Sequence, residues 1–253
     1  PVTPTYMTEG FKVEPDIALP EESTMKKCAG AVLAVLLCSV VLTARADNRQ
    51  DDISRIDASR RVFHEIMNVP DNAIPSDLLD KARCIAIVPS EVKFAFIFGG
   101  RYGKGLVTCR TPHGWSAPVF ILVSGGSVGF QIGGSATDLV LLFMDRRGAI
   151  NLLRNDFKIG ADATGAAGPV GRHVAASTDA SMRAEILTYS RSRGIFAGVS
   201  LNGAVVKVDK SADEALYGHE VNREMALHGN VPVPSAARGL TDEIGRYTGA
   251  AHQ

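Results

Sequence analysis

Residues 84–109 read CIAIVPSEVKFAFIFGGRYGKGLVTC. Short apolar or alternating runs follow one another in this stretch, separated by Pro, Ser and Gly, and this pattern is typical of β-strands joined by turns. Several runs are apolar at every position, as expected of strands that are covered on both faces. The stretch therefore predicts adjoining strands of a sheet that is buried on both sides.

Similar runs continue as far as residue 208 and are also expected to be strands. They lie at residues 117–126, 127–134, 138–144, 157–161, 173–176, 185–190, 195–201 and 204–208. The last two flank Asn202-Gly203, a dipeptide that often forms the two-residue turn of a β-hairpin. Eighteen of the 25 glycines lie between residues 81 and 210. Because glycine marks bulges, bends and close backbone approaches in strands, we expect a strongly curved sheet.

Helices are expected on either side of this region. Residues 51–67 carry apolar side chains near a 3.6-residue period, which predicts a helix that packs one face on the sheet. These side chains are Ile53, Ile56, Phe63, Ile66 and Met67. Further helices are expected from an N-cap at Ser76, over residues 147–154, from a capping box at Ser211 and Glu214, and over residues 235–247. The predicted fold class is α+β: a curved, mainly antiparallel, glycine-rich and barrel-like sheet with an N-terminal helix and short C-terminal helices.

The segment before residue 47 has the layout of an export signal. Met25-Lys26-Lys27 is a short basic start, residues 28–43 are apolar, and Ala44-Arg45-Ala46 has the A-x-A form that signal peptidase prefers. We therefore expect residues 25–46 to be a signal peptide cleaved near Ala46. Residues 1–24 are expected to be a disordered leader or an over-extended start.

Two alternatives to cleavage stay open. A retained membrane anchor is one, although the apolar run is short of the ~20 residues that a span needs. A lipid attached at Cys38 is the other, although Leu37 stands where a small residue is wanted. The exported chain is expected to be a periplasmic or envelope-associated bacterial protein, with a main domain at residues 47–220 and a helical tail at residues 221–253.

Charge is unevenly distributed along the exported part. Residues 47–80 carry a net charge of −4, residues 81–210 a net charge of +8 and residues 211–253 a net charge of −3, whereas the whole chain is neutral. The neutral total gives no bias towards nucleic acid. The basic centre points instead to an anionic surface as a partner.

Two cysteines remain once the signal peptide is removed. Cys84 and Cys109 lie in apolar runs and lack the C-x-x-C spacing of a redox or zinc site. A disulfide between them could form outside the cytoplasm. We expect two buried thiols instead, because cysteine behaves as a small apolar residue in such surroundings.

The sequence offers no convincing catalytic motif. Residues 99–105, GGRYGKG, contain Gly-Lys, but no Ser or Thr follows the lysine as a P-loop requires. His219-Glu220 begins like the zinc motif H-E-x-x-H, but position 223 is Arg. No nucleophile elbow is expected around Ser124 or Ser127. We therefore expect a protein that is not an enzyme and has no cofactor and no metal.

Several motifs occur together in a fixed order. They are ARCIAIVP (82–89), KFAFIFGGRYGKG (93–105), GWSAP (114–118), GGSVGFQIGG (125–134), the strand at 137–144, GAD (160–162), GPVG (168–171) and YSRSRGIFAGVSLNG (189–203). With them the sequence closely resembles the SYLF domain family, also called the Ysc84-type domain. The resemblance covers roughly residues 55–220.

The resemblance implies a lipid-binding module. Eukaryotic members bind phosphoinositide membranes, yeast-type members also bind actin filaments, and bacterial members usually carry export signals. An exported bacterial protein meets no actin, so actin is not an expected partner. Eukaryotic members are thought to use an N-terminal amphipathic segment at membranes, but residues 51–67 mix acidic and basic side chains and lack the cationic bias of a membrane-surface helix.

The expected function is non-enzymatic binding of an anionic phospholipid or a phosphoinositide-type headgroup at the bacterial envelope. The candidate lipid-binding residues lie in or beside one glycine-rich hairpin and are Lys93, Arg101, Tyr102, Lys104 and Arg110. Each cation close to an anionic membrane contributes ~1 kcal/mol, and a tyrosine can anchor at the interface. The alternatives are a scaffold protein of the envelope that binds a protein partner and an unrecognised hydrolase.

Overall fold

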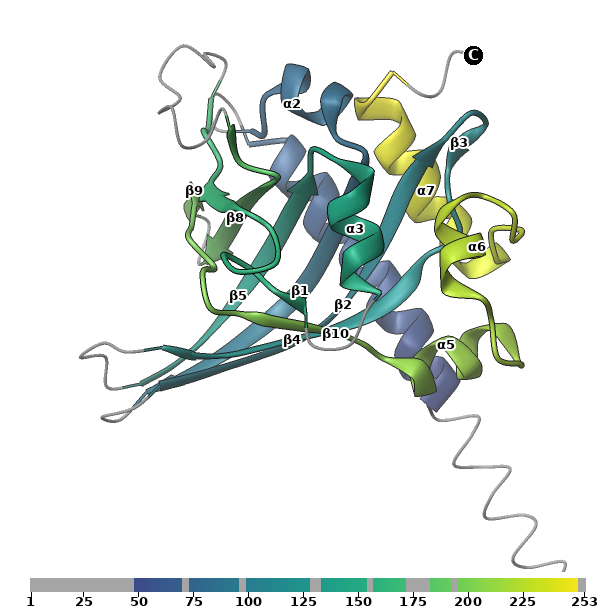
Figure 1. The fold of residues 1–253 in the computed structure, drawn as a ribbon, viewed down its shortest axis with the longest axis horizontal. Coiled ribbons are helices and arrows are strands. Elements are labelled where there is room, and N and C mark those ends of the chain that lie inside the picture. The colour runs from purple at the N-terminus through teal and green to yellow at the C-terminus, as the bar shows by residue number, and fades with distance from the viewer. Residues whose placement is uncertain are drawn as a thin grey trace, which may run out of the picture. The chain divides into compact units, whose positions relative to one another are not determined.

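The apolar runs form one curled sheet in the computed structural model of the chain (Figure 1). The structure describes residues 48–69, 73–95, 99–127, 133–153, 157–171, 183–192 and 195–249, and the ten strands of this part of the chain all belong to that sheet. These residues fall in the second of two units into which the chain divides, Arg45–Gln253. The expected leader, the expected signal peptide and the expected strand at 173–176 lie outside the described residues.

Four long strands make the centre of the sheet. They are β1 (Cys84–Ala95), β2 (Gly99–Thr111), β4 (Val119–Ser127) and β5 (Gly133–Phe143). The shorter strands are β3 (Gly114–Trp115), β6 (Phe157–Lys158), β7 (Gly165–Ala167), β8 (Ile186–Ser192), β9 (Ile195–Gly198) and β10 (Val205–Val208).

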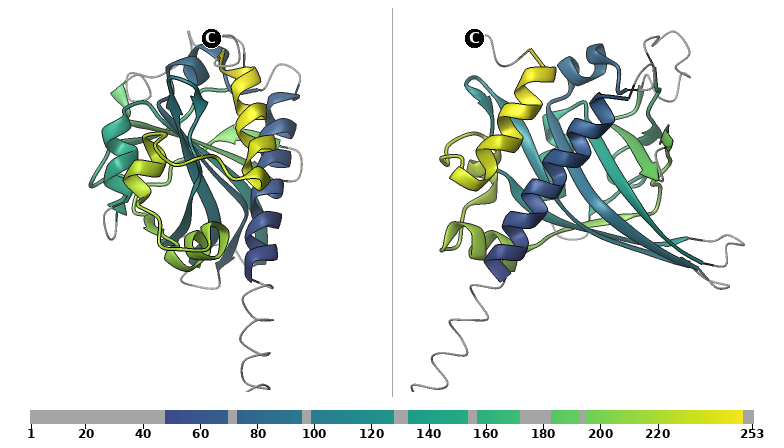
Figure 2. Two further views of the ribbon diagram at one scale, coloured as in Figure 1. Left: turned by 90° about the vertical axis from the view of Figure 1, so that its right-hand side faces the viewer. Right: turned by 180° about the vertical axis from the view of Figure 1, so that it is seen from behind.

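The sheet is almost entirely antiparallel. Its strand order is β6-β10-β4-β2-β1-β5-β8-β7, with β3 paired to β2 and β9 paired to β8. Only the pairing of β7 with β8 is parallel among the named strands of the described residues. The strong curl of the sheet is visible in Figures 1 and 2. The prediction of a curved, mainly antiparallel sheet is confirmed.

Helices cover the sheet on both faces (Figure 2). The first described helix spans residues 48–67 and is called helix 48–67. The others are α2 (Ser76–Lys81), α3 (Arg146–Leu152), α5 (Lys210–Tyr217), α6 (Arg223–Leu227) and α7 (Ser235–Tyr247). Helix 48–67 and α7 lie on one face, and α3 lies on the other (Figure 2).

The apolar stripe of helix 48–67 packs on the sheet as predicted. Ile56, Phe63 and Ile66 are fully buried, and Ile53 is partly buried against the same core. The Phe63 ring also meets the Tyr247 ring of α7 edge-on, with centroids 5.9 Å apart. The helix is therefore part of the core on this face.

The central strands have no solvent face where the helices cover them, because successive side chains point into two different cores. Ile85 and Ile87 of β1 belong to the core under helix 48–67 and α7. Cys84, Ala86 and Val88 belong to the core on the opposite face. This arrangement confirms the prediction of strands that are covered on both sides.

Glycine permits the close approach of β1 and β2 where the sheet bends. The register of this pair shifts between Ile87 and Val92, which marks a β-bulge. A Cβ atom on Gly105 would lie 2.4 Å from the Ile87 carbonyl oxygen, and one on Gly103 would lie 2.5 Å from Val88 Cγ1. Only glycine fits at such distances, so the glycine-rich pattern does support the curvature as expected.

The Asn202-Gly203 turn does not close a hairpin, which corrects the sequence prediction. β9 pairs with β8, whereas β10 pairs with β4 and β6. The turn is real, since Gly203 has a φ of 83° and the Ala204 amide donates to the Leu201 carbonyl. Its backbone bonds to Ile159 instead of joining two paired strands, so it transfers the chain between distant strands of the sheet.

Two predicted helix caps also differ from the structure. The α5 cap is Asp209, whose carboxylate accepts from the Ala212 amide, so the Ser211 capping box does not form. The cap of α2 is Pro75, without a side-chain bond, and Ser76 is the first helical residue. A proline fits there because its fixed φ suits a helix start and no donor is lost.

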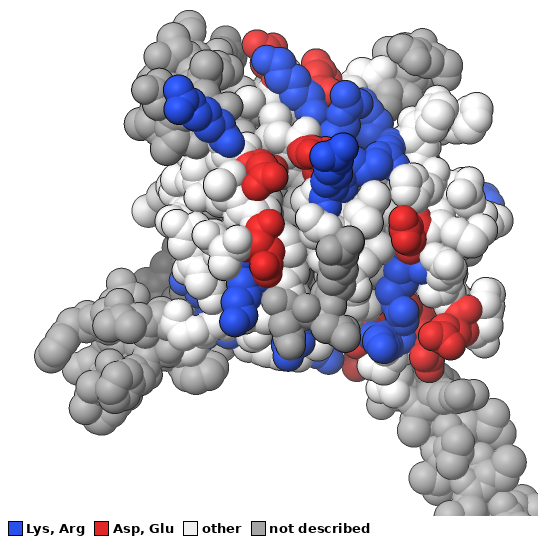
Figure 3. All heavy atoms as spheres, viewed as in Figure 1, with Lys and Arg blue, Asp and Glu red and all other residues white. Residues whose placement is uncertain are grey.

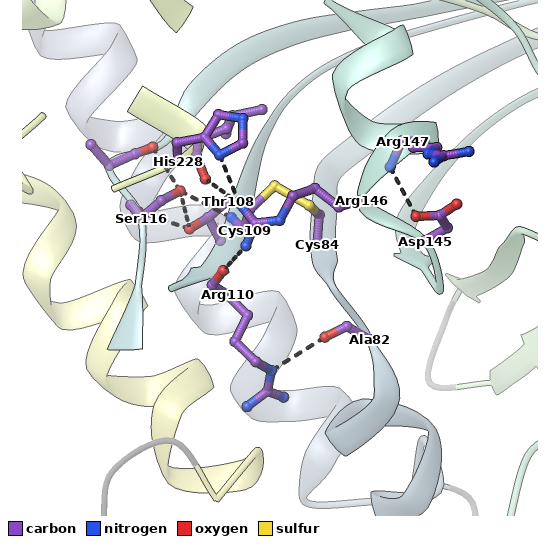
Figure 4. The surroundings of a disulfide bond; sticks show 12 residues. Ala82, Cys84, Thr108, Cys109, Arg110, Ser116, Asp145, Arg146, Arg147 and His228 are labelled. Atoms are coloured by element: carbon purple, nitrogen blue, oxygen red, sulfur yellow. Dashed lines mark hydrogen bonds between the residues drawn. A yellow bond between two sulfur atoms is a disulfide. The ribbon is translucent and has the colours of Figure 1, made fainter. Parts of the chain in front are cut away.

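Cys84 and Cys109 form a disulfide, which corrects the expectation of two buried thiols (Figure 4). The two residues are direct partners in the β1–β2 register and both side chains are fully buried. The Ser116 hydroxyl accepts from the Cys109 amide next to the bond. The bulge and the register place the two sulfurs together, and neither can be deduced from residue types alone.

Candidate functional site

The four neighbouring strands β4, β2, β1 and β5 extend past the helices at one end of the sheet (Figure 1). Val92 of β1 and Tyr102 of β2 are direct cross-strand partners in this region, so their side chains lie on the same face. Their exposed fractions are 49% and 43%, which is high for large apolar residues. The pair forms a small apolar surface at the extended end of the sheet.

Lys104 lies on the same face of β2 as Tyr102, because alternate side chains of a strand point to the same face. It is exposed and close to Asp52 of helix 48–67. Burial raises the pKa of Asp52, and the positive charges of Arg55 and Lys104 oppose that rise. We call Val92, Tyr102 and Lys104 the hairpin strip.

Arg101 points to the opposite face of β2. Its Nε atom lies 3.9 Å from Oε1 of Glu91, which is fully buried, and only 14% of the Arg101 side chain is exposed. Its Nη1 atom is buried without a hydrogen-bond partner. The charge of Arg101 is therefore directed into the molecule, away from the hairpin strip.

Arg110 lies at the far end of β2, next to the disulfide (Figure 4). Its guanidinium donates to the carbonyl oxygens of Leu79, Ala82 and Thr248 at 3.0, 3.3 and 2.9 Å, and it lies 5.1 Å from the centre of the Trp115 ring. Burial lowers its pKa. These bonds tie α2 and the end of α7 to the sheet.

The five predicted residues are thus only partly brought together. Tyr102 and Lys104 share one face, Arg101 faces the other way and Arg110 is remote. The backbone of Lys93 pairs with Arg101 and with Ser135, and its side chain lies outside the described residues. Sequence reasoning missed Val92, because the β-bulge in β1 decides which face that residue joins.

Charge is mixed on the face that Figure 3 shows. Lys and Arg side chains lie beside Asp and Glu side chains across this view, with uncharged surface between them. The basic excess of residues 81–210 therefore does not cover this face as one positive field. On this face, attraction to an anionic partner must come from local groups.

One buried acid was not anticipated. Asp213 of α5 is fully buried, accepts from the Phe120 amide at 2.8 Å and from Arg223 Nε at 2.6 Å. Desolvation raises its pKa to about 6, against the opposing effect of these two bonds. The carboxylate has partners on β4 and at the start of α6, so it joins these elements to α5.

Residues 125–129, GGSVG, contain the letters of the G-x-S-x-G motif. Ser127 is the last residue of β4, where it pairs with Gly99, and β5 begins at Gly133. A nucleophile elbow requires a turn from a strand into a helix, and this serine lies at the end of a strand whose next named element is another strand.

In the described part of the chain, no cluster of three or more His, Cys, Asp or Glu side chains could hold a metal ion. No helix of that part is long and apolar enough to cross a membrane.

The fold is that of an α+β domain in which a curled antiparallel sheet is held between helices. Residues 124–247 match the family model described as "Ysc84: Las17-binding protein actin regulator". The chain belongs to the Ysc84 (SYLF) family, as its motifs indicated.

Three named relatives illustrate the similarity. The human "SH3 domain-containing YSC84-like protein 1" is 35% identical over 192 residues, which are 74% of this chain and 56% of the relative; the rat protein of that name is 34% identical over the same lengths. "Protein YSC84" of Saccharomyces cerevisiae is 33% identical over 174 residues, 67% of this chain and 37% of the relative. The chain therefore matches about half the length of the animal relatives and less of the yeast one.

Proposed function

We propose that this protein binds the surface of anionic membranes, without catalysis, through the hairpin strip. The observation that carries the proposal is the exposed pair Val92 and Tyr102 beside Lys104 on one strand face. An aromatic ring with a polar tip suits the membrane interface, and a neighbouring lysine adds attraction to anionic headgroups. Membership of the Ysc84 family, through the lipid binding that the resemblance implies, supports the proposal.

The proposed binding is weak and depends on ionic strength. One or two lysines near an anionic surface contribute ~1 kcal/mol each. This attraction decays over a Debye length of ~8 Å at physiological salt, so added salt weakens it. The proposed attraction acts on charge alone, so we expect selection for negative charge and little selection between anionic lipids.

The proposed location is outside the cytoplasm, after cleavage near Ala46. The disulfide between Cys84 and Cys109 supports this part of the proposal, because disulfides persist mainly in oxidising compartments. The signal peptide expected at residues 25–46 supports it independently. In this setting the membrane partner is the bacterial envelope.

Vesicle co-sedimentation of the full chain tests the proposal. The vesicles contain phosphatidylcholine with or without phosphatidylglycerol, and the variant is Lys104→Glu. We expect the affinity for the anionic vesicles to fall by about fivefold or more at low salt, since each charge contributes ~1 kcal/mol. Arg101 is left unchanged, because a carboxylate there would face buried Glu91.

The matched control is Lys158→Glu, the same charge reversal at an exposed residue of β6. If both variants lose binding equally, net charge is responsible and the hairpin strip is not the site. Equal binding of neutral and anionic vesicles by the unaltered protein would contradict the electrostatic mechanism.

A scaffold protein that binds a protein partner is the second candidate function. The family description names actin regulation, which favours a protein partner for relatives in the family. Co-sedimentation with actin filaments under the same salt conditions separates the two candidates. Binding to filaments with no binding to anionic vesicles would favour the scaffold function over the membrane function.

A further inference from the structure

A groove of about 300 Å³ lies between helix 48–67 and α7. These two helices run side by side on one face of the sheet (Figure 2). The side chains that line the groove are Arg60, Arg61, His64, Glu65, Glu243 and Arg246. The groove therefore gathers three guanidinium groups and one imidazole from two elements that are far apart in the sequence.

The two helices hold these groups in fixed positions. Glu243 has only 4% of its side chain exposed, and its two oxygens are both engaged: Oε1 lies 2.7 Å from His64 Nδ1, and Oε2 accepts from Arg246. A Cβ atom on Gly239 would lie 3.5 Å from Arg60 Cδ, an ordinary van der Waals distance, so the stem of Arg60 runs close to α7 at this point. The basic groups are thus positioned by the helix contacts.

The acidic partner of Arg60 and Arg61 leaves these two side chains able to bind another anion. Arg60 and Arg61 share one carboxylate, Asp57, in ion pairs that are about half exposed. Exposed pairs of this kind contribute little and exchange partners readily. Glu65 also lines the groove, and its carboxylate is paired with Arg191, which also binds Asp138.

We propose that this groove binds a phosphomonoester dianion, with Arg60, Arg61 and Arg246 as donors. A guanidinium presents several N–H donors in a fixed plane, which match the oxygens of a phosphate group. A dianion can replace the single carboxylate of Asp57 that two of these arginines now share. Because the groove and the hairpin strip consist of different residues, this proposal does not depend on the membrane function.

The local test uses inorganic phosphate as the probe and the His64 imidazole as the reporter. The NMR resonances of His64, assigned with a His64→Gln variant, are followed in the full chain as sodium phosphate replaces sodium chloride at constant ionic strength and pH. We expect a saturable shift. The double variant Arg60→Gln, Arg61→Gln should raise the half-saturating phosphate concentration by about tenfold or more, because hydrogen bonds to charged groups are lost.

The matched control removes the same two charges elsewhere, through Arg147→Gln in α3 and Lys158→Gln in β6, both exposed. Its half-saturating concentration should stay within about twofold of the unaltered protein. The single variant Arg246→Gln approaches the groove from the other helix and should also weaken binding. A His64 shift that chloride produces equally, or equal losses in the double variant and its control, would overturn the proposal.

The source of the phosphomonoester is resolved with vesicles. Phosphatidic acid carries a monoester and phosphatidylglycerol a diester, and the two vesicle types are matched for surface charge. A preference for phosphatidic acid that free phosphate abolishes and that the double arginine variant lacks would assign the groove to a lipid headgroup. Phosphate binding at His64 without this vesicle preference would assign it to a soluble phosphomonoester. A preference that persists unchanged in the double variant would contradict a lipid ligand in the groove.

Discussion

Gly105 lies where the backbone of β1 leaves no space for a side chain on β2, since a Cβ atom there would lie 2.4 Å from the Ile87 carbonyl oxygen. We expect Gly105→Ala to lower the free energy of unfolding by about 3 kcal/mol, because a methyl group there meets the Ile87 carbonyl oxygen and forces the strands apart. Urea unfolding measures the loss. The control is Gly126→Ala in β4, where a Cβ atom meets no atom within 4 Å, and an equal loss there would refute this explanation.

Asp213 gives the stability of the protein a pH dependence of unusual sign. Its folded pKa, about 6, lies above the unfolded value of 3.8, mainly because of burial. The folded state therefore binds this proton more tightly, so the stabilising contribution is complete below about pH 4 and is lost as the pH rises through 6. Between about pH 4 and pH 7, the free energy of unfolding of the unaltered protein should fall by on the order of 3 kcal/mol relative to that of the Asp213→Asn variant. Unfolding in urea across this range, with exposed Asp242→Asn as the matched change, measures the difference; identical curves for both variants would exclude burial as the cause.

Helix 48–67 is an element of the core, and Phe63 is its central contact. Truncation by Phe63→Ala removes a fully buried ring that also meets Tyr247, so we expect a loss of about 3–5 kcal/mol in the free energy of unfolding. Arg61→Ala, on the exposed side of the same helix, should change it by less than about 0.5 kcal/mol. A Phe63→Ala protein of normal stability that has lost vesicle binding would instead identify this helix as a membrane segment.

The disulfide and the predicted signal peptide make one prediction for the whole molecule. When it is isolated from its own cells, the protein should begin at Asp47, and its unfolded chain should have no thiol that reacts with an alkylating reagent until a reductant is added. Intact-mass spectrometry before and after alkylation measures both properties. A chain that retains residues 25–46 would indicate a membrane anchor, and a lipid on Cys38 would indicate a lipoprotein. Free thiols at Cys84 and Cys109 would remove the support that the disulfide gives to a location outside the cytoplasm.

Sequence periodicity predicted the elements well but not their pairing. The runs around Ile85 and the stripe of helix 48–67 depend on local patterns, and both were placed correctly. The Cys84–Cys109 bond and the position of Val92 depend on register and on the β-bulge of β1, and the role of the Asn202-Gly203 turn depends on which strands β9 and β10 pair with. These are set by contacts between strands, and a one-residue shift reverses every side chain, so the pattern of a single strand cannot determine them.

The contact of helix 48–67 with α7 has a consequence for the order in which the chain can complete its structure. His64 and Glu243, which meet in the groove, are separated by 179 positions. A chain that emerges from a ribosome or a translocon with its N-terminus first has the early helix available long before its partner. The core on this face of the sheet therefore cannot be completed until α7 has emerged, and contacts of such long sequence separation form slowly. During that interval Phe63 and Ile66 have no complete cover, so the period just after emergence is when this protein has most need of a chaperone.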